Sequence, residues 1–136
     1  MSDASVHVSA HQLSASGSDV ALVLAISRPE TVADADAAAA YLGLPLVGRI
    51  VVQPVNGPNR GSVADGAQAR AIVDATVTAL MTKRAEWRAK GVVHVFMAAP
   101  FALAALLGHA LNSFAPVHLY EKRFSGDGYV RTLILS

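Results

Sequence analysis

The sequence predicts an α/β fold in three layers, with helices on both faces of a mostly parallel sheet and an antiparallel hairpin at the C-terminal end. Three apolar runs have the length of strands and lack the alternation of half-exposed strands, which is typical of strands buried on both faces. They cover residues 19–27, 48–55 and 92–97. Segments with helical spacing lie between them, and this alternation of strand and helix indicates a parallel sheet.

The third strand, residues 92–97, and the helix that follows it, residues 101–111, form the unit on which the functional prediction rests. Pro100 stands in the first turn of that helix, where a missing N–H is tolerated. In open α/β sheets the free amides of such a first turn point to the crevice beyond the strand's carboxyl end. We therefore expect the turn through Ala99, Pro100 and Phe101 to bind an anionic ligand.

The helix after the first strand carries recognisable start and stop signals. Ser27 and Glu30 have the spacing of a capping box, with Pro29 in the first turn, and Gly43 is a typical helix stop. Ser27 therefore has an ordinary role as a helix cap, although a hydroxyl at the end of a buried strand also suits a ligand site.

The second half of the chain continues the same alternation. A long helix begins at Ser62 or Asp65 and ends near Lys90. A fourth strand covers residues 115–120, and after a turn the chain returns antiparallel over residues 129–135. These elements complete the predicted sheet.

Residues 1–18 predict an N-terminal arm or an added edge strand, and residues 19–136 a single domain. His7 and His11 have the spacing of a metal-binding pair only if this segment is helical, and no third ligand stands nearby. We therefore expect no metal site there.

The composition excludes several classes of protein. The chain has 136 residues, of which 53% are hydrophobic and 15% charged, so it is long enough for one domain with a core and too apolar for disorder. No apolar run approaches the ~18 residues of a membrane span, and the N-terminus lacks the features of a signal peptide. The absence of cysteine removes disulfides and thiol chemistry. These features predict a cytoplasmic protein without a membrane partner.

Charge is uneven along the chain, although the net formal charge is only +1. Residues 1–48 hold five acidic residues and one basic residue, whereas residues 49–136 hold five acidic and ten basic residues. The small net charge argues against a long nucleic acid as partner. Two solvated helix faces of opposite sign explain the pattern, and so does a mildly electropositive mouth suited to a small phosphate ligand.

The residues expected at the carboxyl ends of the strands are suited to binding rather than to catalysis. They offer hydrogen-bonding and stacking groups, or backbone amides: Ser27, Arg28, Gln53, Asn56, Ala99, Pro100, Phe101, Tyr120 and Lys122. The sequence lacks the glycine-rich motifs of P-loop and dinucleotide sites, the nucleophile elbow and the H-E-x-x-H zinc motif. Glu121 and Asp127 are the one local carboxylate pair, and a hairpin charge pair explains them. We therefore expect a ligand-binding site without a catalytic residue, metal or cofactor.

Gly108 interrupts the apolar helix at residues 101–111, where a glycine costs about 1 kcal/mol relative to alanine. A close neighbour, either another helix or a second subunit, would explain it. The helix is apolar almost all round, with Leu103, Leu106 and Leu107 among its residues. This pattern predicts a central helix or an interface.

The stretch HVFMAAPFALAALLGHALN, followed by VHLYE, a short hairpin and a final strand, resembles the SAVED domain. DVALVLAISRPETV and GRIVVQPV precede it at matching spacing, so the resemblance covers about residues 19–135. SAVED domains are sensor modules of bacterial cyclic-oligonucleotide anti-phage signalling (CBASS) and occur in some type III CRISPR accessory proteins. They consist of two halves related to the CARF fold, a Rossmann-like domain. The resemblance implies the C-terminal half of such a domain and a cyclic oligonucleotide as ligand.

The resemblance also implies which positions face the ligand. They are the turn at residues 98–101, the strand ends at Ser27, Arg28 and Gln53, and the pair Tyr120 and Glu121. No fused nuclease, TIR, protease or membrane effector is expected from the sequence, and only one half of the domain is present. We therefore expect a homodimer, a chain that acts beside a separate effector, or a fragment of a longer protein. A ring nuclease that degrades the messenger and an assembly module without ligand are the alternative functions.

Overall fold

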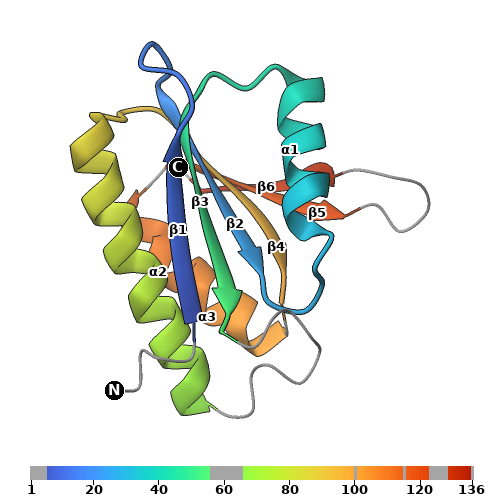
Figure 1. The fold of residues 1–136 in the computed structure, drawn as a ribbon. Helices are drawn as coiled ribbons and strands as arrows, with labels where there is room; N and C mark the ends of the chain where they lie inside the picture. Colours follow the sequence, from blue (N-terminus) through green and yellow to red (C-terminus); the bar gives the residue numbers. More distant parts are fainter. Residues whose placement is uncertain (1–5, 56–65, 100, 115, 123–128, 136) are drawn as a thin grey trace.

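The computed structural model describes residues 6–55, 66–99, 101–114, 116–122 and 129–135, which form one sheet flanked by helices on both faces (Figure 1). The described strands are β1 (Val6–Gln12), β2 (Asp19–Ala25), β3 (Leu46–Pro54), β4 (Val93–Ala98), β5 (Val117–Lys122) and β6 (Tyr129–Leu135). The described helices are α1 (Thr31–Leu42), α2 (Gly66–Trp87), α3 (Phe101–Leu111) and a short 3₁₀ turn at Asn112–Phe114.

The strands of the described residues lie in the order β1-β3-β2-β4-β5-β6. The four central strands, β3, β2, β4 and β5, are parallel, whereas β1 runs antiparallel to β3 and β6 runs antiparallel to β5. The predicted α/β class, with a mostly parallel sheet and a C-terminal antiparallel pair, is therefore confirmed. The residues expected to form the hairpin turn, 125–128, lie outside the described residues.

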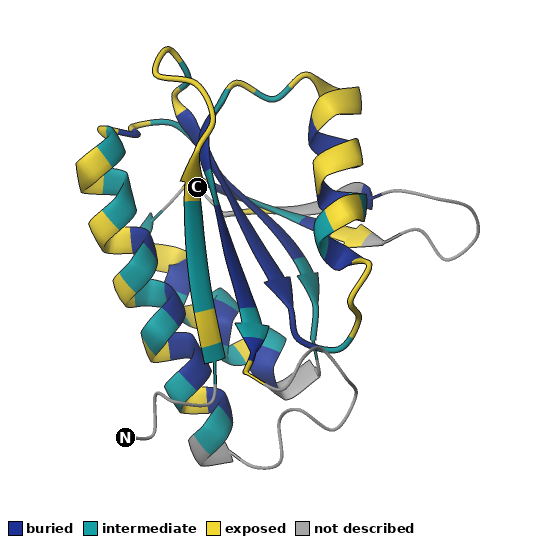
Figure 2. Cartoon of the chain, in the orientation of Figure 1, coloured by how far each residue is buried: buried dark blue, intermediate teal, exposed yellow. Residues whose placement is uncertain are grey.

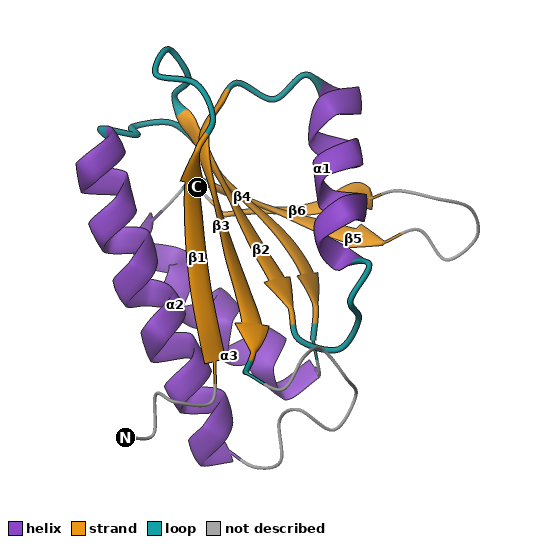
Figure 3. Cartoon of the chain, in the orientation of Figure 1, coloured by secondary structure: helices purple, strands orange, loops and turns teal. Residues whose placement is uncertain are grey.

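The helices form two layers on opposite faces of the sheet (Figure 3). Along β2, the side chains at 20, 22 and 24 join the core cluster under α2 and α3, and those at 21 and 23 join the cluster under α1. Every residue of β2 is buried (Figure 2). This two-sided burial explains why the sequence of the central strands is continuously apolar.

Gly48 allows α2 to lie close to the sheet. The ring of Trp87, the last residue of α2, occupies the position that a Cβ at Gly48 would take. Trp87 also marks the end of the helix, three residues before the predicted end at Lys90, because Arg88 adopts a left-handed conformation with φ 54°. The predicted start at Ser62 or Asp65 lies outside the described residues.

The predicted capping box at the start of α1 is wrong. The N-cap residue is Glu30, which makes no capping hydrogen bond with its side chain. The amide of Ser27 instead donates to the carbonyl of Ala98 at 2.8 Å, which keeps Ser27 attached to the sheet. The hydroxyl of Thr31 donates to the carbonyl of Arg28 at 2.8 Å. Because the chain leaves the sheet only after Ser27, the helix starts three residues later than a Ser27 cap requires.

Candidate functional site

The carboxyl ends of β2 and β4 lie side by side, and the chain leaves them toward opposite faces of the sheet. β2 continues through α1 to β3 on one side, and β4 continues through α3 to β5 on the other. A place where neighbouring parallel strands diverge in this way is the usual ligand position in open α/β sheets. The candidate site is therefore this carboxyl edge of the sheet.

Hydrogen bonds show where the two strands separate. The amides of Ile26 and Ser27 both donate to the carbonyl of Ala98, at 3.1 and 2.8 Å. β2 and β4 consequently stay joined up to these residues, and the loops diverge directly beyond them. Ser27 and Ala99 are both half-buried, and Arg28 is exposed. Ser27, just beyond the end of β2, thus lies next to the end of β4 at Ala98.

The remaining predicted site residues are distributed less evenly. Gln53 lies at the end of β3 and is half-buried. Phe101 is the first residue of α3 and Lys122 the last of β5, but their side chains are not described. Asn56 and Pro100 lie outside the described residues. The structure therefore places Ser27, Arg28, Gln53 and Ala99 at one edge of the sheet.

Tyr120, which the sequence predicts at the end of its strand, lies instead two residues before the end of β5. It pairs with Phe96 in the middle of the sheet, and the two rings stack with centroids 4.5 Å apart. Its hydroxyl lies 2.7 Å from Nδ1 of His94, and only 5% of the residue is exposed. Tyr120 is a core residue under α1, because β5 extends two residues beyond it to Lys122.

Sequence reasoning missed Tyr129, which pairs with Lys122 at the carboxyl edge and lies under the start of α1. It is buried, and its ring meets the edge of Phe96 at 5.3 Å. Burial raises the pKa of Tyr129 to about 12, and the carboxylate of Asp34 adds to the rise. A hydrogen bond with Thr31 acts in the opposite direction. The first residue of a strand after a hairpin gives no sequence signal for such a position.

The opposite, amino end of the sheet holds a buried polar network that closes on itself. Nε2 of His94 lies 2.7 Å from Oδ2 of Asp19, and Nδ1 lies 2.7 Å from the hydroxyl of Tyr120. Oδ1 of Asp19 accepts hydrogen bonds from the amide of Val92 at 3.0 Å and from the hydroxyl of Ser18 at 2.9 Å. His94 is therefore a packed core histidine.

The pKa of Asp19 reflects this network. Burial alone would raise the pKa of the carboxyl group, but the hydrogen bonds from His94, Val92 and Ser18 outweigh burial and lower it. The network resembles a catalytic relay in composition, yet His94 is only 3% exposed. A substrate has no access to its ring, so the arrangement stabilises the fold.

A hollow of about 330 Å³ lies between the outer surfaces of α2 and α3. Apolar side chains, including Val73, Val77 and Leu106, line it together with Arg70 and Asp74. Gly108 lies on the same helix as Leu106, but a Cβ at Gly108 would meet no heavy atom within 4 Å. The close neighbour that was expected for Gly108 is thus absent from the described part of this chain.

Within the described residues, the structure shows no feature that indicates a metal site or a membrane-spanning helix. His7 and His11 lie on the strand β1 and not on a helix, so the helical pair considered from the sequence does not form. No group of three or more histidine or acidic side chains there can hold a metal ion. Among the helices that the structure describes, none is both long and apolar enough to cross a membrane.

Comparison with solved structures identifies the fold. The chain aligns with the SAVED/CARF-domain containing receptor Cap4 of Acinetobacter baumannii in complex with the cyclic trinucleotide 3'3'3'-cAAA, with a TM-score of 0.73 and 17% identity. The same receptor with 2'3'3'-cAAA gives a TM-score of 0.72 at 16% identity, and another Cap4 structure gives 0.61 at 20%. These alignments cover 94–96% of this chain but only 26–27% of the receptor. The chain thus spans about a quarter of the receptor's length.

No curated protein matches the chain. A family model, by contrast, matches residues 2–135, which extends the expected similarity from residue 19 to almost the whole chain and includes β1. The chain therefore belongs to the SAVED family, described as the SMODS-associated and fused to various effectors sensor domain.

Proposed function

We propose that this protein binds a cyclic oligonucleotide at the carboxyl edge of its sheet and acts as a sensor in prokaryotic anti-phage defence. The observation that carries the proposal is the divergence of the chain beyond Ser27 and Ala98, which creates the ligand position typical of open α/β sheets. The match of this fold to a receptor that holds cyclic trinucleotides supports the same ligand class.

The chemistry of the edge suits a phosphate-containing ring. The α3 helix begins at Phe101, directly beyond β4, so its first amides are oriented toward an anion at the edge. Ser27 adds a hydroxyl that no helix cap uses, and Arg28 adds an exposed cation. The guanidinium of Arg28 lies 4.0 Å from the carboxylate of Glu30, but both side chains are about half exposed, so solvent weakens this pair.

The proposal extends to the setting in which the sensor acts. A cytoplasmic system of the CBASS or type III CRISPR kind, with a separate or fused effector, agrees with the family's description as a domain fused to various effectors. A homo-oligomer agrees with the open space beside Gly108 on α3. Light scattering with and without ligand tests the assembly: we expect a dimer or larger species, and a monomer under both conditions contradicts it.

Ligand binding is tested by thermal denaturation of the purified chain with cyclic di-, tri- and tetranucleotides, starting with 3'3'3'-cAAA and 2'3'3'-cAAA. A ligand present at 100 times its dissociation constant stabilises the folded state by about 2.7 kcal/mol, which raises the melting temperature by several degrees. Linear trinucleotides of the same bases serve as controls. The absence of a shift with every ring contradicts the proposal and favours an assembly module.

The ring-nuclease alternative is separated by the fate of the ligand. After incubation for several hours, chromatography of the ligand shows whether the ring remains closed. We expect it to remain intact, because the enclosed His94 network lies at the opposite end of the sheet from the candidate site. Appearance of linear product in proportion to protein concentration contradicts a pure sensor.

A further inference from the structure

Strand β1, at the edge of the sheet, places the polar residue His7 near the candidate site. Because β1 runs antiparallel to β3, its first residues lie beside the carboxyl end of β3, and His7 is directly opposite Gln53. Val6, Val8 and Ala10 pack against the core on the α2 side. The alternation of side chains along a strand therefore turns His7 to the other face, that of α1.

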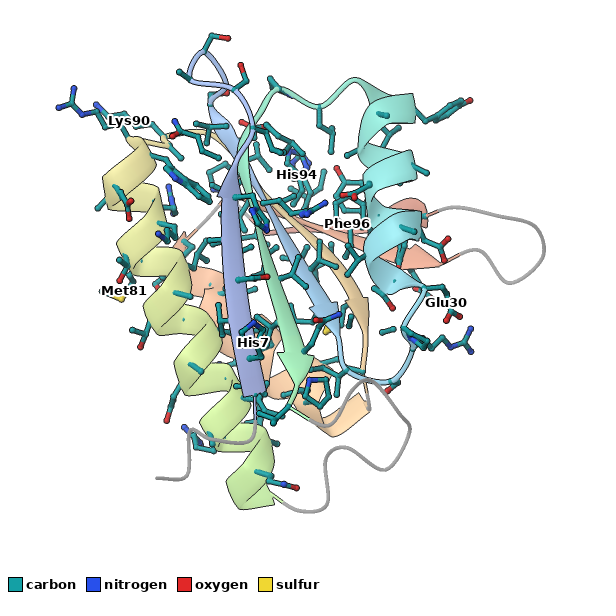
Figure 4. All side chains as sticks on the ribbon, viewed as in Figure 1. His7, Glu30, Met81, Lys90, His94 and Phe96 are labelled. Carbon is teal, nitrogen blue, oxygen red and sulfur yellow. The ribbon has the colours of Figure 1, made fainter. Side chains whose placement is uncertain are left out.

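The position of His7 is open. Its side chain is exposed, whereas that of Gln53 is half-buried. Among the described elements, α1 packs mainly against β2, β4 and β6, while β1 lies at the edge of the sheet beyond β3. Figure 4 shows His7 beside the carboxyl end of β3, while His94 lies toward the other end of the sheet.

Another histidine of the same strand has a different environment. His11 pairs with Arg49, whose guanidinium forms an ion pair with Asp36 of α1. His11 lies toward the amino end of the parallel strands, four residues along β1 from His7. The two histidines share strand, face and exposure, and they differ in their distance from the carboxyl edge.

We propose that the ligand site extends across β3 onto β1, where His7 donates a hydrogen bond to a phosphate of the ligand beside Gln53. The Cβ atoms of two directly opposed residues lie roughly 5 Å apart. The imidazole N–H of His7 and the amide N–H of Gln53 can therefore contact one phosphate group together. From β4 to β1 the site crosses three strand spacings, about 14 Å. A ligand that contacts both the α3 turn and His7 must therefore carry phosphates at separated positions, as an oligonucleotide ring does.

This proposal rests on the proposed function. Its test compares His7→Ala with the matched variant His11→Ala. Binding of 3'3'3'-cAAA, or of the ring that binds best in the panel, is measured by titration calorimetry. Loss of a hydrogen bond to a charged phosphate weakens binding about tenfold. We expect this loss for His7→Ala only, and partial recovery in His7→Gln, which restores an N–H donor. Urea denaturation of each variant checks that the edge strand remains folded.

The outcomes separate the two proposals. If the wild-type protein binds a ring and His7→Ala binds it equally well, the extension to β1 is wrong and the cyclic-oligonucleotide site remains. If both histidine variants lose affinity equally, the effect comes from the edge strand as a whole, which also contradicts a direct contact. If the wild-type protein binds no ring, both proposals are wrong.

Discussion

The two ends of the parallel sheet differ in how far their polar side chains are hydrogen-bonded. At the amino end, the carboxylate of Asp19 receives three hydrogen bonds, and the His94 ring is bonded through both nitrogens. At the carboxyl end, the hydroxyl of Ser27 caps no helix, and the Arg28 guanidinium has only a long, half-exposed contact with Glu30. The first end is closed and the second is open.

This difference shows how composition alone misleads. Asp, His and Tyr are typical catalytic residues. At the amino end, however, Asp19, His94 and Tyr120 form hydrogen bonds with one another, and Asp19 also accepts one from the backbone of Val92. Serine, arginine and alanine are ordinary surface residues, yet at the carboxyl end they stand where two neighbouring strands diverge. Access and unfilled hydrogen-bonding capacity therefore identify the candidate site better than residue type.

The largest expected effect is loss of stability in Asp19→Asn, at the closed end. The asparagine amide carries no charge opposite His94. Its NH2 group also faces N–H groups whose hydrogen bonds the carboxylate accepts. We expect the free energy of unfolding at pH 7, measured by urea denaturation, to fall by about 3 kcal/mol. Ligand affinity of the folded variant should be unchanged, since the network lies at the other end of the sheet. A stability equal to that of wild type contradicts the structural role.

The same variant predicts a pH dependence. Because the pKa of Asp19 is lowered in the folded state, its contribution to stability is present above the ordinary value of 3.8 and is lost as the pH falls through the lowered value. The stability difference between wild type and Asp19→Asn should therefore shrink below pH 3.8. Asp36→Asn, which changes an exposed carboxylate, is the matched control and should leave a small difference.

Two glycines offer a second way to sharpen the comparison. A Cβ at Gly91 would overlap the carboxylate of Asp19 and the carbonyl of Ser18, whereas a Cβ at Gly108 would meet nothing. We expect Gly91→Ala to lower the free energy of unfolding by about 2 kcal/mol through this overlap. Gly108→Ala should raise it by about 0.5–1 kcal/mol, because alanine favours the helix interior. Equal effects in the two variants would contradict the tight packing at the closed end.

At the open end the expected loss is in affinity instead of stability. Arg28→Ala should weaken binding of the cyclic oligonucleotide about tenfold, the effect of one charge-assisted hydrogen bond. Its effect on unfolding should be small, because the contact with Glu30 is solvent-exposed. Lys90→Ala removes an exposed cation just before β4, at the closed end, and serves as the control for net charge. Equal losses in the two variants would indicate nonspecific attraction.

The sequence was sufficient for the elements whose signals are local. The apolar runs of the central strands, the antiparallel return at residues 129–135 and the helix at residues 101–111 all appear as predicted. The adjacency of Ser27 and Ala98 at the strand ends follows from the strand–turn–helix pattern and a general rule of parallel sheets. The SAVED resemblance rests on the same segments.

What failed depended on register and on contacts distant along the chain. The predicted cap at Ser27 is wrong because the backbone of Ser27 pairs with Ala98, and this pairing competes with the start of a helix. The sequence predicts Tyr120 at a strand end because local signals do not locate the end of β5 to within two residues. The bond between Asp19 and His94 joins residues 75 positions apart, and no periodicity of the sequence predicts it.

The smallest expected effect concerns Tyr129, a buried residue at the open end. Its hydrogen bond with Thr31 contributes about 1 kcal/mol, which Tyr129→Phe removes near neutral pH. Because burial raises the pKa from 10.0 to about 12 in the folded state, the unfolded chain ionises first, and the wild-type protein loses stability relative to Tyr129→Phe as the pH rises from 10 toward 12. Urea denaturation from pH 8 to 12 should show the wild-type advantage shrinking only above pH 10. Tyr41→Phe, at a residue that is 89% exposed, should follow the wild-type curve throughout. If the difference in free energy of unfolding between wild type and Tyr129→Phe stays constant over this pH range, the tyrosine is open to solvent, and the solvent-exposed edge of the sheet includes Tyr129.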